Sequence, residues 1–190
     1  MSVNENKPHV LLSILMVIVI LLMIAIAALF LRMNQLQETV VAALSSSQGQ
    51  PVGLAIGTSA PEFALVDTNG VDVSLIDYSG HWVLLGFTSI TCPVCKTTYP
   101  YIKKFSEERS DIQVILISKG SAEENQQLVQ EQGFHFPVLT IGDEPTGVIL
   151  EYKVPGTPFF YLIDKSGVIR SVGFANTTDQ IHALVDGVIK

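Results

Sequence analysis

A chain of 190 residues has room for one globular domain and a further segment. Hydrophobic residues make up 48% of it, and the formal net charge at pH 7 is −7. This acidity argues against a nucleic-acid partner, because surfaces that bind phosphate are rich in Lys and Arg. A solvated acidic surface is enough to explain the charge.

Residues 10–31 are the first distinctive segment, and they follow a short N-terminus, residues 1–9. The segment contains no charged residue, and Ser13 is its only polar one. At about 1.5 Å per residue, a helix of this length spans about 33 Å, enough to cross a hydrocarbon core of about 30 Å. We therefore predict a single transmembrane anchor. A cleaved signal peptide is the alternative, since residues 25–27 resemble a cleavage site, but the apolar part of such peptides is only about 7–15 residues long.

The charges beside this segment say little about its orientation, because Lys7 on one side is nearly balanced by Arg32 on the other. Residues 33–91 contain no Lys or Arg, which favours moving that side across the membrane. We expect residues 1–9 in the cytoplasm and the C-terminal domain on the periplasmic side of the inner membrane.

Residues 32–56 are predicted to form a helical stalk and a linker. Apolar residues recur within 32–44 at the a and d positions of two heptads, which are too few to indicate a coiled coil. Residues 45–51, rich in Ser, Gln and Gly, then have the composition of a linker.

Residues 57–190 are predicted to form one α/β domain. Apolar runs predict strands at 63–66, 71–75, 82–87, 112–117, 137–141, 159–163 and 168–173. Helices are predicted at 93–109, 121–132 and 177–189, with a helical turn at 147–152. Strands that alternate with helices indicate a mixed central sheet with helices on both faces, preceded by a β-hairpin. In that hairpin, Asn69-Gly70 is expected to supply the positive φ angles of the turn.

Side-chain patterns add detail to two of these helices. The helix at 121–132 should begin with a capping box of Ser121 and Glu124 and end at Gly133. The buried stripe of the helix at 93–109 is expected to consist of Val94, Tyr101, Ile102 and Phe105.

Cys92 and Cys95 are the only two cysteines, and they form a C-x-x-C pair after an apolar run. Cys92 should lie at a helix N-terminus, where free N–H groups and the helix dipole stabilise a thiolate, and Pro93 suits the first turn of that helix. We therefore predict thiol–disulfide exchange, with Cys92 as the nucleophile and Cys95 as the resolving thiol. A permanent disulfide or a buried cysteine pair is the alternative. Structural zinc needs four ligands, and there is no second C-x-x-C, so we predict no metal and no cofactor.

Two stretches, Phe87–Lys96 and Val154–Phe159, resemble the two signature motifs of the thioredoxin fold. In that family the X-Pro peptide of the second motif is cis and lies against the cysteines. The resemblance thus implies that Thr157 and Pro158 position the substrate, with Thr91 and Pro93 supporting the first motif. Residues 60–63 resemble the membrane-anchored TlpA and redoxin branch, and the anchor, linker and motif together are most similar to the MauD type of methylamine utilisation protein.

The resemblance implies a membrane-anchored thiol–disulfide oxidoreductase that acts on protein thiols and disulfides outside the cytoplasm. A redox partner would reset its cysteine pair, and a disulfide-rich subunit of methylamine dehydrogenase is a candidate client. An oxidant, a reductant and an isomerase share this architecture and differ in redox potential, so the direction of electron flow stays open.

The chain departs from the family at three positions near the pair. The family often has a buried acid where this chain has Gly86, a Trp where it has Thr91, and in some reductases a Glu where it has Thr98. A proton acceptor for Cys95 is therefore missing from the usual positions. Lys96 could stabilise a thiolate, but a solvated lysine is the simpler interpretation.

Two other functions fit part of the pattern. A peroxiredoxin-like peroxidase would use Ser89–Cys92, although Leu85 replaces the Pro of that motif. A Sco-like copper-delivery protein would bind Cu(I) through both thiolates and a histidine, either His135 or His81, although the cysteines of that family are four residues apart.

Overall fold

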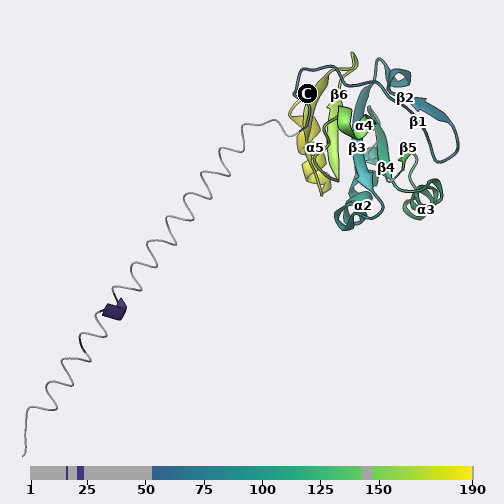
Figure 1. Cartoon of the computed structure of the whole chain (residues 1–190). Coiled ribbons are helices and arrows are strands. Elements are labelled where there is room, and N and C mark those ends of the chain that lie inside the picture. Colours follow the sequence, from purple (N-terminus) through teal and green to yellow (C-terminus); the bar gives the residue numbers. More distant parts are fainter. Residues whose placement is uncertain (1–15, 17–20, 24–52, 143–146, 190) are drawn as a thin grey trace, which may run out of the picture. The chain divides into compact units, whose positions relative to one another are not determined.

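The structure is a computed structural model, and it describes residues 16, 21–23, 53–142 and 147–189 (Figure 1). The chain divides into two units, residues 1–50 and residues 51–190. The predicted anchor and stalk lie almost entirely outside the described residues; of the anchor, residues 16 and 21–23 are described and are helical. Within the described parts, the structure contains no helix with the length and apolar character needed to cross a bilayer.

A five-stranded mixed sheet forms the centre of the second unit, in the order β5–β4–β3–β6–β7. β3, β4 and β5 run parallel, whereas β6 and β7 are antiparallel to their neighbours. The predicted mixed sheet is thus confirmed. The strands are β3 (Trp82–Ser89), β4 (Ile112–Lys119), β5 (Val138–Ile141), β6 (Phe159–Ile163) and β7 (Ile169–Phe174).

Other elements cover both faces of this sheet. Successive side chains of β3 point to opposite faces, so they pack in two different clusters. Leu84 packs in the cluster that includes residues of α2, α3 and α5, whereas Leu85 packs in the cluster under α4 and the N-terminal hairpin (Figure 1). Helices on both faces were expected, and the structure confirms them. The first face carries α2 (Pro93–Glu108), α3 (Ala122–Gln132) and α5 (Thr178–Asp186), and the second carries β1 (Ala64–Val66), β2 (Asp72–Ser74), η1 (Leu75–Tyr78) and α4 (Gly147–Glu151).

The turn between β1 and β2 is only partly as predicted. Gly70 has a positive φ of 80°, but Asn69 does not. Instead, Asp67 Oδ1 accepts hydrogen bonds from the backbone N–H groups of Asn69 at 2.8 Å and Val71 at 2.9 Å. A carboxylate that satisfies two turn amides removes the need for two residues in the left-handed region.

The buried stripe of α2 differs from the prediction. Val94 and Tyr101 are 44% and 40% exposed, so they are not core residues. The buried positions are Cys95, Thr98, Tyr99, Ile102 and Phe105. Their spacing of three and four residues is that of one helix face, and its first member is the second cysteine of the motif.

The ends of the other helices follow their capping signals. Ser121 and Glu124 form the predicted capping box of α3, and Gly133 ends that helix with a φ of 63°. Thr177 caps α5, but this helix ends at Asp186 rather than 189, because Gly187 follows it as the C-cap. The short helix η1 was not predicted.

Candidate active site

Cys92 occupies the N-cap of α2, directly after the central strand and its short loop. Its Sγ accepts a hydrogen bond from the backbone N–H of Cys95 at 3.2 Å, as a capping oxygen would. Pro93 takes the first helical position, where no N–H is needed. The backbone N–H of Cys92 donates to the Ser89 carbonyl at 3.1 Å, and the Ser89 and Thr91 hydroxyls are 2.9 Å apart. These bonds fix the loop that presents the sulfur.

The two thiols differ in access. Cys92 is partly exposed, whereas Cys95 is fully buried against the cluster on the α2 face of the sheet. Both are free thiols in this structure. A bulky partner can therefore reach Cys92 while Cys95 is shielded.

The loop before β6 lies against this pair. The Thr157–Pro158 peptide is cis, and Pro158 is buried. The Cys92 thiol donates a hydrogen bond to the Thr157 carbonyl at 3.4 Å. Residues 65 positions apart in sequence are thereby brought together at the reactive sulfur.

The two thiols also differ in pKa. Partial burial acts to raise the pKa of Cys92, but hydrogen bonds from the Cys95 thiol and the Thr157 hydroxyl outweigh it and lower that pKa below its ordinary value. Burial raises the pKa of Cys95 instead, and its hydrogen bond to Cys92 adds to the rise. Because the thiolate is the nucleophile, Cys92 is the sulfur ready to react.

Alkylation by iodoacetamide should show this difference in pKa. An ordinary cysteine loses reactivity as the pH falls through about 8.5. Since the pKa of Cys92 is lowered, its thiolate persists below that pH, and its alkylation rate should decline only at lower pH. In the Cys95→Ala variant a hydrogen bond that lowers the pKa is gone, so the decline should move toward higher pH. Identical profiles for Cys92 in the folded and the urea-unfolded chain would contradict this expectation.

The structure shows what surrounds Gly86 and Thr98, the two positions near the pair where the family resemblance would place an acid. A Cβ at Gly86 would lie 2.7 Å from Leu116 Cδ2 and 2.8 Å from Phe160 Cε1, so the site has no room for a carboxyl. Thr98 is buried, and its hydroxyl donates to the Val94 carbonyl at 2.8 Å. Neither position supplies a base to Cys95.

Tyr99 is a site residue that the sequence analysis missed. It is 1% exposed, and its hydroxyl donates to the Ser89 carbonyl at 3.3 Å, the same carbonyl that accepts from Cys92 N–H. Its place four residues after Cys95 on α2 was the available signal, because residues with this spacing share a helix face.

The remaining sequence candidates lie on the surface. Lys96 is exposed, and it makes no ion pair within the part of the chain that the structure describes. His81 and His135 are exposed as well. Among the described residues, no three His, Cys, Asp or Glu side chains gather as a metal site would require.

Comparison with known proteins identifies the family. Residues 56–172, more than half of the chain, match the AhpC/TSA family. The chain belongs to the AhpC/TSA family. The matched range includes both cysteines and the Thr157–Pro158 peptide.

Individual relatives of this AhpC/TSA chain include a methylamine utilization protein and a thiol-disulfide oxidoreductase. The methylamine utilization protein MauD of Paracoccus versutus is 33% identical over 134 residues, which cover 70% of this chain and 66% of MauD. The thiol-disulfide oxidoreductase ResA of Geobacillus thermodenitrificans is 28% identical over 126 residues, or 65% of this chain and 71% of ResA. The chain thus spans just under two thirds of the length of that MauD protein.

A solved structure confirms the fold of this AhpC/TSA domain. The thioredoxin domain of a thiol-disulfide oxidoreductase from Bacteroides vulgatus superimposes with a TM-score of 0.64 at 24% identity. The match covers 72% of this chain and 99% of that domain. The thioredoxin-like α/β fold is therefore established. Among the relatives, ResA is named a thiol-disulfide oxidoreductase.

Proposed function

We propose that this chain is a membrane-anchored thiol–disulfide oxidoreductase that acts on proteins outside the cytoplasm. The observation that carries the exchange chemistry is the asymmetry of the pair: Cys92 is accessible and has a lowered pKa, whereas Cys95 is buried beside it and has a raised one. A permanent structural disulfide would need neither property.

The exchange conserves electrons and protons at every step. To reduce a client, the Cys92 thiolate attacks one client sulfur, an S–S bond forms between them, and the second client sulfur leaves as a thiolate. Cys95 then gives up its proton to solvent and attacks Cys92 Sγ. The first client sulfur leaves as a thiolate, which can take up a proton from solvent. Two electrons pass from the cysteine pair to the client, and a partner must reduce the new Cys92–Cys95 disulfide. An oxidant follows the same steps in reverse.

The surrounding residues have supporting roles in this proposal. Thr157 and Pro158 position the client beside Cys92, as their place against that sulfur suggests. Thr91 and Pro93 hold the loop and the first helical turn in the shape that exposes the nucleophile.

The cellular setting rests on the sequence and on the named relatives. An uncharged apolar stretch at 10–31 would anchor the chain in the inner membrane, and residues 32–56 would hold the domain at 57–190 in the periplasm. The MauD relative is named for methylamine utilization, so a disulfide-rich subunit of methylamine dehydrogenase is the client we propose to test first.

One experiment tests both the chemistry and the location. Spheroplasts that produce the full-length chain are given insulin, which does not cross the inner membrane, and dithiothreitol as the reductant. We expect insulin to precipitate faster than with spheroplasts that produce Cys92→Ala, because only the wild type can accelerate the slow transfer of electrons from dithiothreitol to the insulin disulfides. Activity that emerges only after lysis would disprove the location, and no activity in either sample would disprove the exchange.

A further inference from the structure

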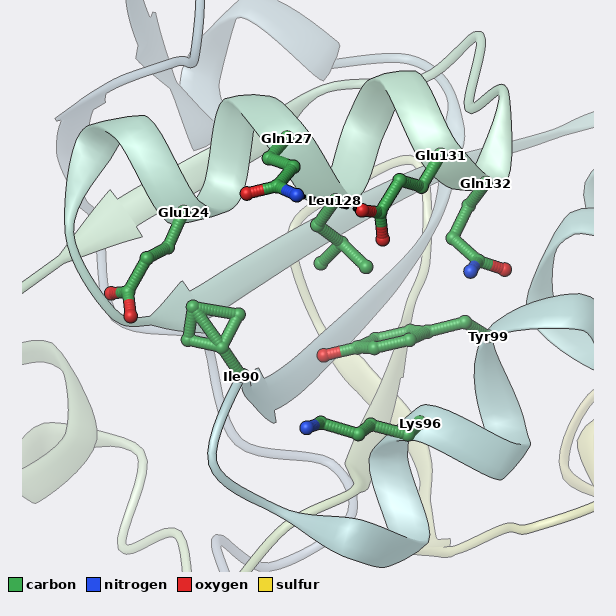
Figure 2. Close-up of a pocket in the computed structure, with 8 residues that line it drawn as sticks. All are labelled: Ile90, Lys96, Tyr99, Glu124, Gln127, Leu128, Glu131 and Gln132. Carbon is green, nitrogen blue, oxygen red and sulfur yellow. Dashed lines mark hydrogen bonds between the residues drawn. The ribbon is translucent and has the colours of Figure 1, made fainter.

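A pocket of about 370 Å³ lies between α2 and α3, on the same face of the sheet as Cys95 (Figure 2). Its α2 side is formed by Lys96 and Tyr99, and its α3 side includes Glu124, Leu128 and Glu131. No step of the exchange reaction uses this pocket.

The pocket is close to the redox pair along the chain. Ile90, which lines it, precedes Cys92 by two residues, and Lys96 directly follows Cys95. Two extended residues span at most about 7 Å. A client segment joined to Cys92 therefore brings its neighbouring side chains, two to four residues from its own cysteine, within reach of the pocket.

The lining combines apolar walls with a negative rim. Ile90, Leu128 and the ring of Tyr99 supply carbon surface, and two carboxylates face one ammonium group. Figure 2 shows the Glu124 and Glu131 side chains directed from α3 toward the α2 side of the pocket. The excess of carboxylate over ammonium favours a cationic occupant.

Both carboxylates have capacity left for a ligand. Glu124 Oε2 accepts from the Ser121 backbone N–H at 2.9 Å, and Glu131 Oε1 accepts from Gln127 Nε2 at 2.8 Å. A carboxylate offers about four acceptor positions, so each can accept further hydrogen bonds. The hydrogen bonds from Ser121 also lower the pKa of Glu124, which favours its charged form.

We propose that this pocket binds a Lys or Arg side chain of the client protein, located two to four residues from the cysteine that reacts with Cys92. The apolar walls match the methylene stem of such a side chain, and the two carboxylates match its charged head. The inference rests on the proposed exchange function and adds a rule for client choice. Clients with a basic residue near the reactive cysteine are handled faster.

Pairs of synthetic peptides test this rule with the reduced full-length chain. Each peptide has one cysteine in a mixed disulfide with thionitrobenzoate, and the two members of a pair differ only by Arg or Gln at one position, two to four residues from that cysteine. Attack by Cys92 on the peptide sulfur releases coloured thionitrobenzoate, whose rate gives kcat/KM. At low salt we expect the Arg peptide of at least one pair to react roughly three- to tenfold faster, the range for one or two exposed ion pairs.

Two double variants distinguish binding in the pocket from general attraction by the negative charge of the domain. Glu124→Gln with Glu131→Gln should reduce the Arg preference to near one. Glu107→Gln with Glu123→Gln, two exposed residues of α2 and α3 outside the pocket, should keep it. Gln at position 124 can still occupy its place in the capping box, and the single variant Glu131→Gln should show part of the loss even if the double variant unfolds.

The outcomes distinguish the pocket from the exchange function. Equal rates for the Arg and Gln peptides at every position would contradict the proposed binding in the pocket, but they would leave the exchange function intact. An equal loss of the Arg preference in both double variants would also contradict the proposed binding, because the preference would then come from the overall negative charge of the domain. If no peptide released thionitrobenzoate, the exchange function itself would fail.

Discussion

The Cys95→Ser variant is expected to accumulate a covalent adduct between Cys92 and a client cysteine, where the wild type shows none. Cys92 keeps its exposed position and still attacks a disulfide, but the serine hydroxyl at position 95 cannot attack the resulting mixed disulfide. Release should slow by on the order of a hundredfold or more, because only external thiols remain to attack the mixed disulfide. Non-reducing electrophoresis of the full-length chain, with mass spectrometry of the linked peptides, would reveal the adduct.

The reciprocal variant is the matched control. Cys92→Ser leaves only the buried thiol, whose pKa is raised, so it should form few adducts under the same conditions. If both single variants trapped clients equally, the assignment of Cys92 as the attacking sulfur would be wrong. If neither trapped anything, the pair would have a structural role instead.

Replacing Gly86, a buried residue of the central strand β3, should destabilise the domain strongly. In Gly86→Ala the added Cβ would overlap Leu116 and Phe160, which are both fully buried, at a cost of about 1–3 kcal/mol. In Gly86→Asp a carboxyl without a partner is buried as well, which adds roughly 2 kcal/mol or more. Urea unfolding of the variants would measure both losses.

Gly142→Ala provides a matched comparison for that experiment. A Cβ at this exposed position meets no atom within 4 Å, and its φ is not in the left-handed region. We expect its unfolding free energy to change by less than about 0.5 kcal/mol. A Gly86→Asp variant as stable as the wild type, with a faster resolving step, would show that the site can accept a catalytic acid after all.

The fold and the cysteine motif could be predicted because their signals are local. The continuous apolar runs at 82–87 and 112–117 have the composition of strands that are buried on both faces, and they became β3 and β4. The position of Cys92 at a helix N-terminus also follows from neighbouring residues alone: a strand before it and Pro93 after it.

The features that were missed depend on contacts distant in sequence or on competing local bonds. Val94 and Tyr101 looked like core residues of α2 by type, but the helix rotates Cys95 and Tyr99 toward the sheet instead. The pocket required α2 and α3 to be placed side by side, and no pattern within either helix specifies that spacing. The turn before β2 was misread because the Asp67 side chain competes with backbone preference. The predicted anchor at 10–31 remains a prediction.

The hydrogen bond from Cys92 to the Thr157 carbonyl can exist only while that sulfur carries a proton. Ionisation, attachment of a client and closure of the Cys92–Cys95 disulfide each remove the donor. We therefore expect this bond between the Thr157 carbonyl and Cys92 in the protonated, reduced protein alone. The step that attaches a client also removes the donor from this carbonyl oxygen, so a main-chain acceptor becomes available beside Cys92 for a donor group of the client.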